Sequence, residues 1–166
     1  MLRNCDRTIA EIILLAALAL PTLAQNQQPL DVPAAPLPAQ LVNAKKVFIA
    51  NGAGDNDPSF AKYTNGPNGP YNQFYANVKA LGRYELAASP SEADVILELR
   101  VDYLRYYNGG GYFKLRLEIR DPRTNVLLWT FAEPVTEAIG EKAERKYVAE
   151  ALGKLTDDLK NVATTP

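Results

Sequence analysis

The chain has 166 residues, with 18 Lys and Arg against 19 Asp and Glu, a net charge of −1 and no histidine. A charge balance of this kind argues against a nucleic-acid-binding protein, which usually carries a basic excess. Cys5 is the single cysteine, so an intrachain disulfide is excluded. Because the chain also has no histidine, a Cys/His zinc site and a histidine general base are excluded as well.

The first 24 residues are typical of a secretory signal peptide. Arg3 and Arg7 form a short basic start, and residues 12–20 are an uninterrupted apolar run. Thr22 and Ala24 place small residues at the two positions that a signal peptidase inspects. An uncleaved anchor is the alternative, but this run is much shorter than the roughly 20 residues that span a bilayer. We therefore expect cleavage after Ala24 and a mature chain with no transmembrane span, located in the periplasm or, alternatively, outside the cell.

Cys5 precedes the apolar run, whereas the acylated cysteine of a bacterial lipoprotein follows it directly. The mature chain is therefore expected to carry no lipid anchor and no cysteine nucleophile. Cleavage also removes two basic and two acidic residues, so the net charge stays at −1. About 140 residues remain, which is enough for a single domain with its own core.

Residues 25–44 contain four prolines among Gln and Ala and show no hydrophobic periodicity. Such a segment favours extended conformations and is expected to be a disordered tether. A single α+β domain, residues 45–163, should follow it. The domain is expected to begin with a short buried strand at 47–50.

The patterns then follow one another in the overall order β-α-β-β-β-β-α. Apolar residues at helical spacing predict a helix over 71–81, between Pro70 and Gly82. Further strands are predicted at 84–88, 93–107, 113–120 and 126–133, and a final amphipathic helix at 141–162. The two longest strands alternate strictly between apolar and charged residues. We expect an antiparallel β-meander with the two helices packed on its apolar face.

The hairpin between the two longest strands has a register set by side-chain parity. Both strands carry their apolar residues at odd positions, so the loop must contain an odd number of residues or a bulge. A three-residue loop, 108–110, pairs Tyr107 with Gly111 and places unlike charges opposite one another. A five-residue loop would instead place Arg100 opposite Arg120 and Asp102 opposite Glu118, which are like charges. We therefore favour the three-residue loop. Its expected pairs are Glu98 with Arg120, Arg100 with Glu118, and Asp102 with Arg116.

Catalytic patterns are scarce in this sequence. Glu98, Asp102 and Glu118 resemble the carboxylates of a glycoside hydrolase, but in the expected register each faces an arginine on a solvated sheet face, which favours a charge ladder. Residues 51–57 lack the Gly and Glu positions of a calcium loop and the third Gly of a dinucleotide loop. No serine lies in a Gly-x-Ser-x-Gly or Ser-x-x-Lys setting. We predict no enzyme, no catalytic residue, no metal and no cofactor.

The aromatic tip of the hairpin is the surface feature that the sequence singles out. Strands of this length would extend beyond their neighbours, so the tip should bend or project. Exposed Tyr and Arg are frequent in binding hot spots. The alternative is that these residues only cover the end of the sheet. The candidate partner-binding residues are Tyr103, Arg105, Tyr106, Tyr107, Tyr112 and Phe113.

Three segments together carry a resemblance: residues 91–100 (SEADVILELR), residues 121–130 (DPRTNVLLWT) and the closing amphipathic helix. The pattern resembles a broad group of exported bacterial envelope proteins, many of them lipoproteins, whose small α+β domain is similar to the amino-terminal domain of the TolB family. The resemblance implies a fold and supplies no catalytic signature.

We therefore expect an exported, non-enzymatic binding or assembly accessory module of the bacterial envelope. Its expected partner is an envelope protein or a glycan, and not a nucleic acid. A soluble periplasmic binder of a small molecule or glycan is the alternative, and a carboxylate-dependent hydrolase is a more remote one.

Overall fold

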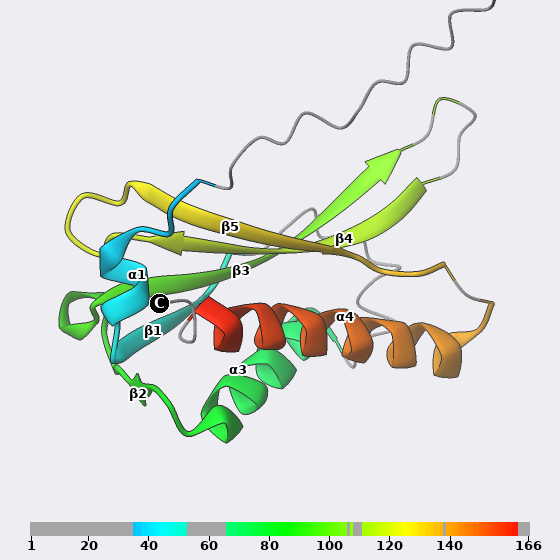
Figure 1. The fold of residues 1–166 in the computed structure, drawn as a ribbon. Coiled ribbons are helices and arrows are strands. Elements are labelled where there is room, and N and C mark those ends of the chain that lie inside the picture. The colour runs from blue at the N-terminus through cyan, green and yellow to red at the C-terminus, as the bar shows by residue number, and fades with distance from the viewer. Residues whose placement is uncertain (1–34, 53–65, 106, 108–110, 138, 163–166) are drawn as a thin grey trace, which may run out of the picture. The chain divides into compact units, whose positions relative to one another are not determined.

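The computed structural model describes residues 35–52, 66–105, 107, 111–137 and 139–162. Within them, a five-stranded sheet has the strand order β2-β1-β3-β4-β5 (Figure 1). In chain order the elements are α1 (Ala39–Asn43), β1 (Lys46–Asn51), α3 (Gly69–Leu81), β2 (Glu85–Leu86), the 3₁₀ helix η1 (Pro90–Glu92), β3 (Val95–Arg105), β4 (Gly111–Arg120), β5 (Leu127–Pro134) and α4 (Glu141–Val162). The predicted α+β class is confirmed.

β3 and β4 form the centre of the sheet because their alternating sequences give it one apolar and one charged face. The apolar side chains at odd positions are almost completely buried. They are Val95, Leu97, Leu99, Leu115, Leu117 and Ile119. The charged side chains at even positions lie on the other face of the sheet.

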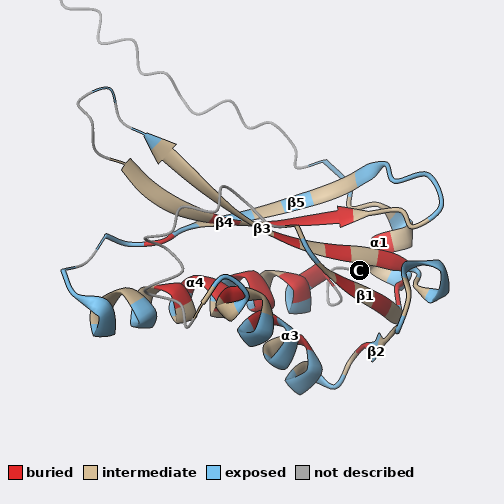
Figure 2. Ribbon diagram, turned by 180° about the vertical axis from the view of Figure 1, so that it is seen from behind, coloured by how far each residue is buried: buried red, intermediate tan, exposed pale blue. Residues whose placement is uncertain are grey.

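α3 and α4 cover the apolar face (Figures 1 and 2). α3 has Pro70 in its first turn and is followed by Gly82, whose positive φ of 64° suits the left-handed conformation of a helix C-cap. The amphipathic α4 runs alongside it and buries a longer apolar stripe. No helix among the described residues is long and apolar enough to span a membrane.

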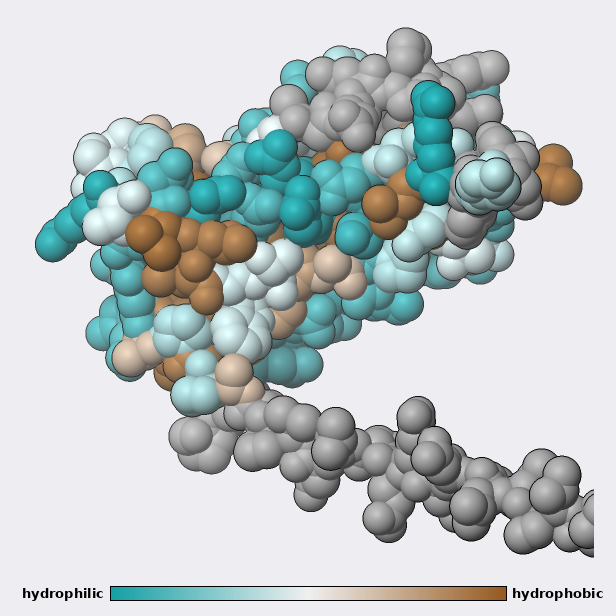
Figure 3. Space-filling view, turned by 90° about the horizontal axis from the view of Figure 1, so that it is seen from above, coloured by the Kyte–Doolittle hydropathy of each residue, from teal (hydrophilic) through white to brown (hydrophobic). Residues whose placement is uncertain are grey.

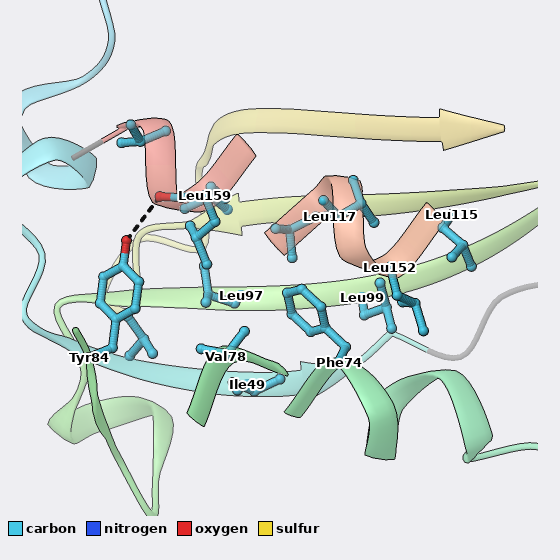
Figure 4. Packing of buried hydrophobic residues seen from close by; sticks show 14 of the residues in the cluster. Ile49, Phe74, Val78, Tyr84, Leu97, Leu99, Leu115, Leu117, Leu152 and Leu159 are labelled. Carbon is cyan, nitrogen blue, oxygen red and sulfur yellow. Dashed lines mark hydrogen bonds between the residues drawn. The ribbon is translucent and has the colours of Figure 1, made fainter. Parts of the chain in front are cut away.

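The core lies between these helices and the sheet (Figure 4). Phe74 of α3 and Leu152 of α4 are both fully buried against the apolar sheet residues. At the edge of the core, the Tyr84 hydroxyl donates a hydrogen bond to the carbonyl of Leu159 at 3.4 Å. Burial raises the pKa of Tyr84. The core therefore ties β2 and both long helices to the central hairpin.

The sheet is mixed, so the expected antiparallel meander holds only for β3, β4 and β5. β1 lies between β2 and β3 and is parallel to both. α3 connects β1 to β2 and returns the chain to the end of the sheet where β1 begins, which makes these strands parallel. The chain then crosses the same end of β1 to reach β3, and the Ala87 and Asp94 amides donate to the carbonyls of Val47 and Lys46. Hydrophobic patterns identify strands but carry no strand direction.

The predicted boundary between tether and domain at residue 45 is wrong. α1 occupies Ala39–Asn43, inside the segment expected to be disordered. Leu41 is 1% exposed and belongs to the core, and Ala44 is buried as well. A five-residue helix with one buried leucine is too short to show a hydrophobic period. The predicted signal peptide and residues 25–34 of the tether lie outside the described residues and stay predictions.

The register of the β3–β4 hairpin differs by two residues from the predicted one. Arg105 lies opposite Gly111, so five residues, 106–110, join the strands in place of three. The odd loop length is confirmed, and so is the shared face of the apolar residues. Like charges lie opposite one another, Glu98 opposite Glu118 and Arg100 opposite Arg116, in a register that differs from both alternatives considered for the sequence.

Candidate partner-binding surface

The β3–β4 hairpin continues past the strands on either side of it (Figure 1). Among the described residues, the β1 pairing with β3 ends at Leu99 and the β5 pairing with β4 begins at Lys114. We call the part beyond these pairs the hairpin end, with Tyr103–Arg105, Tyr107 and Gly111–Phe113 as its described residues. It includes the candidate binding residues apart from Tyr106, which lies outside the described residues.

The base of the hairpin end is an aromatic pair. Tyr103 and Phe113 lie opposite each other, with ring centroids 4.9 Å apart and planes tilted by 47°. The Arg105 guanidinium lies 6.0 Å from the Tyr103 ring centroid. A Cβ at Gly111 would lie 2.8 Å from the Tyr103 ring and in collision with the Leu104 carbonyl. Glycine at this position therefore allows the Tyr103 ring to cover the adjacent strand.

Tyr107 and Tyr112 differ in exposure. Tyr107 has a relative exposure of 110%, so its whole side chain is available to a partner. Tyr112 is partly buried and lies opposite Leu104, whereas the predicted three-residue loop would have placed it opposite Tyr106. Tyr112 also lines an open groove of about 660 Å³, together with Pro134, Val135, Thr136 and Glu137.

Six charged side chains form a continuous network on the face of the hairpin opposite the helices: Glu98, Arg100, Asp102, Arg116, Glu118 and Arg120. Arg120 contacts Glu98 at 2.8 Å and Glu118 at 2.5 Å. Arg116 contacts Asp102 at 3.1 Å and Glu118 at 3.3 Å, and Arg100 contacts Glu98 at 3.0 Å. Each carboxylate therefore has at least one guanidinium partner.

This network is the expected charge ladder with a different geometry. Its ion pairs run diagonally between the strands or along one strand, because the long arginine side chains reach positions two residues away. The hydrogen bond to Glu118 is the main cause of the raised pKa of Arg120. Glu118 is only 5% exposed, so the expectation of a fully solvated face is wrong at this residue.

The chain that leaves β1 passes close over the network. The Gly52 amide donates to the carbonyl of Leu99 at 2.8 Å. A Cβ at Gly52 would lie 2.6 Å from Cγ of Arg100 and 2.8 Å from Oε1 of Glu98. The absence of a side chain at Gly52 therefore allows the two charged side chains to pack beneath the backbone.

A polar groove of about 570 Å³ lies at the other end of the sheet and was missed by sequence reasoning. It is lined by Gln40, Asn43, Ala44, Lys45, Ala93, Asp94, Asp121, Pro122 and Arg123. The signal that points to it is positional: Asp94 directly precedes β3 and Asp121 directly follows β4. Antiparallel pairing of these strands brings both residues to the same end of the sheet.

Both groove carboxylates accept backbone hydrogen bonds. Oδ2 of Asp94 accepts from the amides of Lys46 and Lys45, each at 2.9 Å, and these bonds lower the pKa of Asp94. Oδ1 of Asp121 accepts from the amides of Thr124 and Arg123 at 2.8 and 2.7 Å, which lowers the pKa of Asp121. These two aspartates belong to the segments that carry the sequence resemblance, so the resemblance reflects residues that form the fold.

Within the part of the chain that the structure describes, no cluster of three or more Cys, Asp or Glu side chains could hold a metal ion. The candidate calcium loop, residues 51–57, lies outside the described residues from residue 53 onward.

Comparison with known proteins gives only distant likenesses. No family model and no curated protein matches this chain. Among solved structures, it is similar to the PelC dodecamer from Paraburkholderia phytofirmans, at 14% identity over 76% of this chain and 92% of that chain, with a TM-score of 0.45. It is also similar to a putative neuraminyllactose-binding hemagglutinin homolog from Helicobacter pylori, at 12% identity over 79% and 92%, with a TM-score of 0.48. Protein XCC0632 from Xanthomonas campestris matches at 12% identity over 80% and 90%, with a TM-score of 0.41. At TM-scores below 0.5, these likenesses carry no inference about family or function.

Proposed function

We propose that this chain is an exported, non-enzymatic module that binds a protein partner in the bacterial envelope through its hairpin end. The observation that carries the proposal is the position of Tyr107. Its side chain is fully exposed beyond a base formed by the paired rings of Tyr103 and Phe113. Tyr and Arg side chains are enriched in the energetically dominant parts of protein interfaces. A tyrosine side chain has only two rotatable torsions, so it offers a large contact area at a low cost in conformational entropy.

The non-enzymatic part of the proposal is supported by the chemistry of the available side chains. The sequence contains no histidine, and the carboxylates nearest to one another in the charge network each contact an arginine. A carboxylate that is already bound by guanidinium groups is a poor general acid. The groove aspartates, Asp94 and Asp121, are likewise occupied by backbone amides.

Export and an envelope location belong to the same proposal. They are supported by the signal pattern in residues 1–24 and by the sequence resemblance to a broad group of exported envelope proteins. The intact mass of the chain recovered from the periplasmic fraction tests export, and we expect a species that begins at Gln25. A species that keeps Met1 would show that the apolar run is retained and would contradict a soluble exported module.

The binding test compares two exposed tyrosines. A photo-crosslinking residue at position 107, expressed in the native envelope, should capture a defined protein that the same residue at position 75 does not capture. Tyr75 is the control because it is the same residue type, is 39% exposed and lies on α3, outside the hairpin end.

The captured protein then allows a direct measurement. Tyr107→Ser should weaken its binding about tenfold or more, which corresponds to about 1.4 kcal/mol, while Tyr75→Ser should leave affinity unchanged. Equal affinities for the two variants would refute the role of the hairpin end.

The groove beside Tyr112 is the observation that favours the alternative, a binder of a small molecule or glycan. Its volume of about 660 Å³ and its lining by Tyr112 and Pro134 suit a sugar ring stacked on an aromatic side chain. Saturable binding of a sugar panel that is lost in Tyr112→Ala and kept in Tyr107→Ser would favour this second function over the first.

A further inference from the structure

β5 is the last strand on one side of the sheet. Among the described residues, no other strand pairs with its outer edge. Natural proteins usually protect such an edge with lysines, prolines or bulges. β5 has a bulge near Leu127 and a proline, Pro134, at its end, but its middle carries only one charge, Glu133, which contacts Lys154 of α4 at 3.5 Å. The segment between the bulge and Pro134 is therefore an unprotected edge.

The backbone groups that face outward can be identified from the pairing with β4. The amide of Val135 donates to the carbonyl of Phe113 at 2.8 Å, which fixes the alternation of the ladder. Trp129, Phe131 and Glu133 therefore direct their backbone groups to β4, because bonding positions alternate along an antiparallel strand. Thr130 and Ala132 direct theirs away from the sheet, and both residues are exposed.

We propose that this edge pairs with β5 of a second copy of the chain. The two strands run antiparallel, and the two-fold axis lies between the Phe131 residues of the two copies. In this register Thr130 of each chain lies opposite Ala132 of the other, and each pair exchanges two backbone hydrogen bonds. Other two-fold registers bring into the ladder either Leu128, which lies in the bulge, or Pro134, which has no amide proton. The edge is thus complementary to itself in one register.

The side chains suit the same arrangement. Phe131 would face its own copy at a position between hydrogen-bonded pairs, where opposing side chains come closest and aromatic pairs stabilise the sheet. Thr130 and Ala132, on the other face, are small enough to leave the approach open. Glu133 would lie opposite Trp129 of the second copy, so no like charges meet across the new edge.

The surface around this edge is consistent with an apolar contact. Val126 and Leu127, at the start of β5, are 57% and 47% exposed. Figure 3 looks down on the side of the molecule where β5 lies and shows a hydrophobic area at one end of a mostly hydrophilic surface. A second copy would cover part of this area when its β5 is added to the sheet.

Sedimentation of the purified full-length mature chain tests the proposal. The parent should shift from one to two copies as its concentration rises. Ala132→Pro removes an outward amide without touching the pairing with β4, and should stay monomeric. Ala132→Val keeps the amide and should dimerise like the parent. A parent that is monomeric up to millimolar concentration, or an Ala132→Pro variant as dimeric as the parent, overturns the proposal.

Hydrogen exchange of the unaltered chain gives a second readout, which holds even if Ala132→Pro fails to fold. The amides of Thr130 and Ala132 should exchange more slowly at high than at low chain concentration, because they become hydrogen-bonded in the dimer. If the exchange rate of these two amides does not depend on chain concentration, the proposal is overturned. The edge would then either stay free or bind a strand of another protein. Neither result depends on Tyr107, so the proposed function is tested separately.

Discussion

Glu98 lies directly opposite Glu118 across the β3–β4 hairpin, and both carboxylates bind the guanidinium of one residue, Arg120. Like charges opposite each other in antiparallel strands are normally unfavourable. Arg120 lies opposite Ile96, from where its side chain reaches diagonally to Glu98 and along its own strand to Glu118. This bridge, together with the contacts of Arg100 to Glu98 and of Arg116 to Glu118, makes the register tolerable. Glu118 is buried, and its contact with Arg120 is the shorter of its two, so it depends on Arg120 most.

We predict that Arg120→Gln destabilises the domain. Glu118 would keep only the contact with Arg116 at 3.3 Å. Breaking a fully buried ion pair costs about 3–5 kcal/mol, and because Arg116 remains and Arg120 is partly exposed we expect a loss of about 1.5–3 kcal/mol in the free energy of unfolding. Chemical denaturation measures it. Arg145→Gln, which breaks an exposed pair with Glu141 on α4, should cost less than about 0.5 kcal/mol. Equal losses in the two variants would contradict a special role for Arg120.

The same relationship explains where the sequence-based register was wrong. The prediction counted only charges directly opposite one another, and on that criterion a loop at 108–110 is better. The structure satisfies its charges diagonally, and two of the expected contacts, Glu98 with Arg120 and Asp102 with Arg116, form in spite of the shifted register. Parity was predictable because burial of the odd residues is worth far more than any one exposed ion pair. A shift of the register by two residues keeps the odd residues buried. The choice between such registers depends on ion pairs and cross-strand contacts whose energies are too small to predict from sequence.

The strand directions and the domain boundary were not predictable for different reasons. The direction of β1 depends on where α3 returns the chain, and a helix is compatible with both parallel and antiparallel neighbours. Leu41 is buried by tertiary contacts that a five-residue helix cannot reveal locally. At the hairpin end, the expectation that the two long strands extend beyond their neighbours agrees with the strand pairing, whereas the binding role of the aromatic residues stays a prediction. Sequence patterns could not separate Phe113, which packs against the core, from Tyr107, which is fully exposed.

Two glycines should respond to alanine in opposite ways. A methyl group at Gly52 would lie 2.6 Å from Cγ of Arg100, close to the backbone end of that side chain, so the strand or the charge network must shift. We expect Gly52→Ala to cost about 1–3 kcal/mol. Gly153 lies within α4 and a methyl group there meets no atom within 4 Å. Gly153→Ala should stabilise the domain by about 0.5–1 kcal/mol, since alanine favours a helix interior. Urea unfolding of both variants checks the signs, and a stabilised Gly52→Ala variant would contradict the packing described above.

The stability contributed by Asp94 should depend on pH. Hydrogen bonds from the amides of Lys46 and Lys45 hold the pKa of Asp94 below its ordinary value in the folded chain. The stabilisation is therefore present above the unfolded pKa of about 3.9 and is lost as pH falls through the lower folded pKa. Asp94→Asn should unfold at a lower denaturant concentration than the parent at pH 6, and the difference should shrink as pH falls below about 4. A difference that stays constant from pH 6 to pH 2 would show that the charge of Asp94 plays no part.

The pKa of Asp158 is shifted in the opposite direction to that of Asp94. Burial, followed by the nearby charges of Glu133 and Asp157, raises the pKa of Asp158 in the folded chain. Its ionised form therefore opposes folding above that pKa, and the penalty disappears as pH falls below about 4. Asp158→Asn should raise the denaturation midpoint at pH 7 and leave it unchanged at pH 3. A variant that is less stable than the parent at pH 7 would mean that the carboxylate has a stabilising partner.

Substitutions at the base of the hairpin end should lower the free energy of unfolding, whereas a substitution at its exposed tyrosine should not. Phe113 packs on Tyr103 and against the edge of the core, so Phe113→Ala should cost about 1–3 kcal/mol, less than for a fully buried phenylalanine. Tyr107 is fully exposed, so Tyr107→Ser should change the free energy of unfolding by less than about 0.5 kcal/mol. Thermal unfolding of both variants in one buffer makes the comparison. Equal destabilisation by Tyr107→Ser and Phe113→Ala would mean that Tyr107 packs on the end of the sheet. A side chain packed there is not available to a partner, so this result would contradict the proposed binding role of Tyr107.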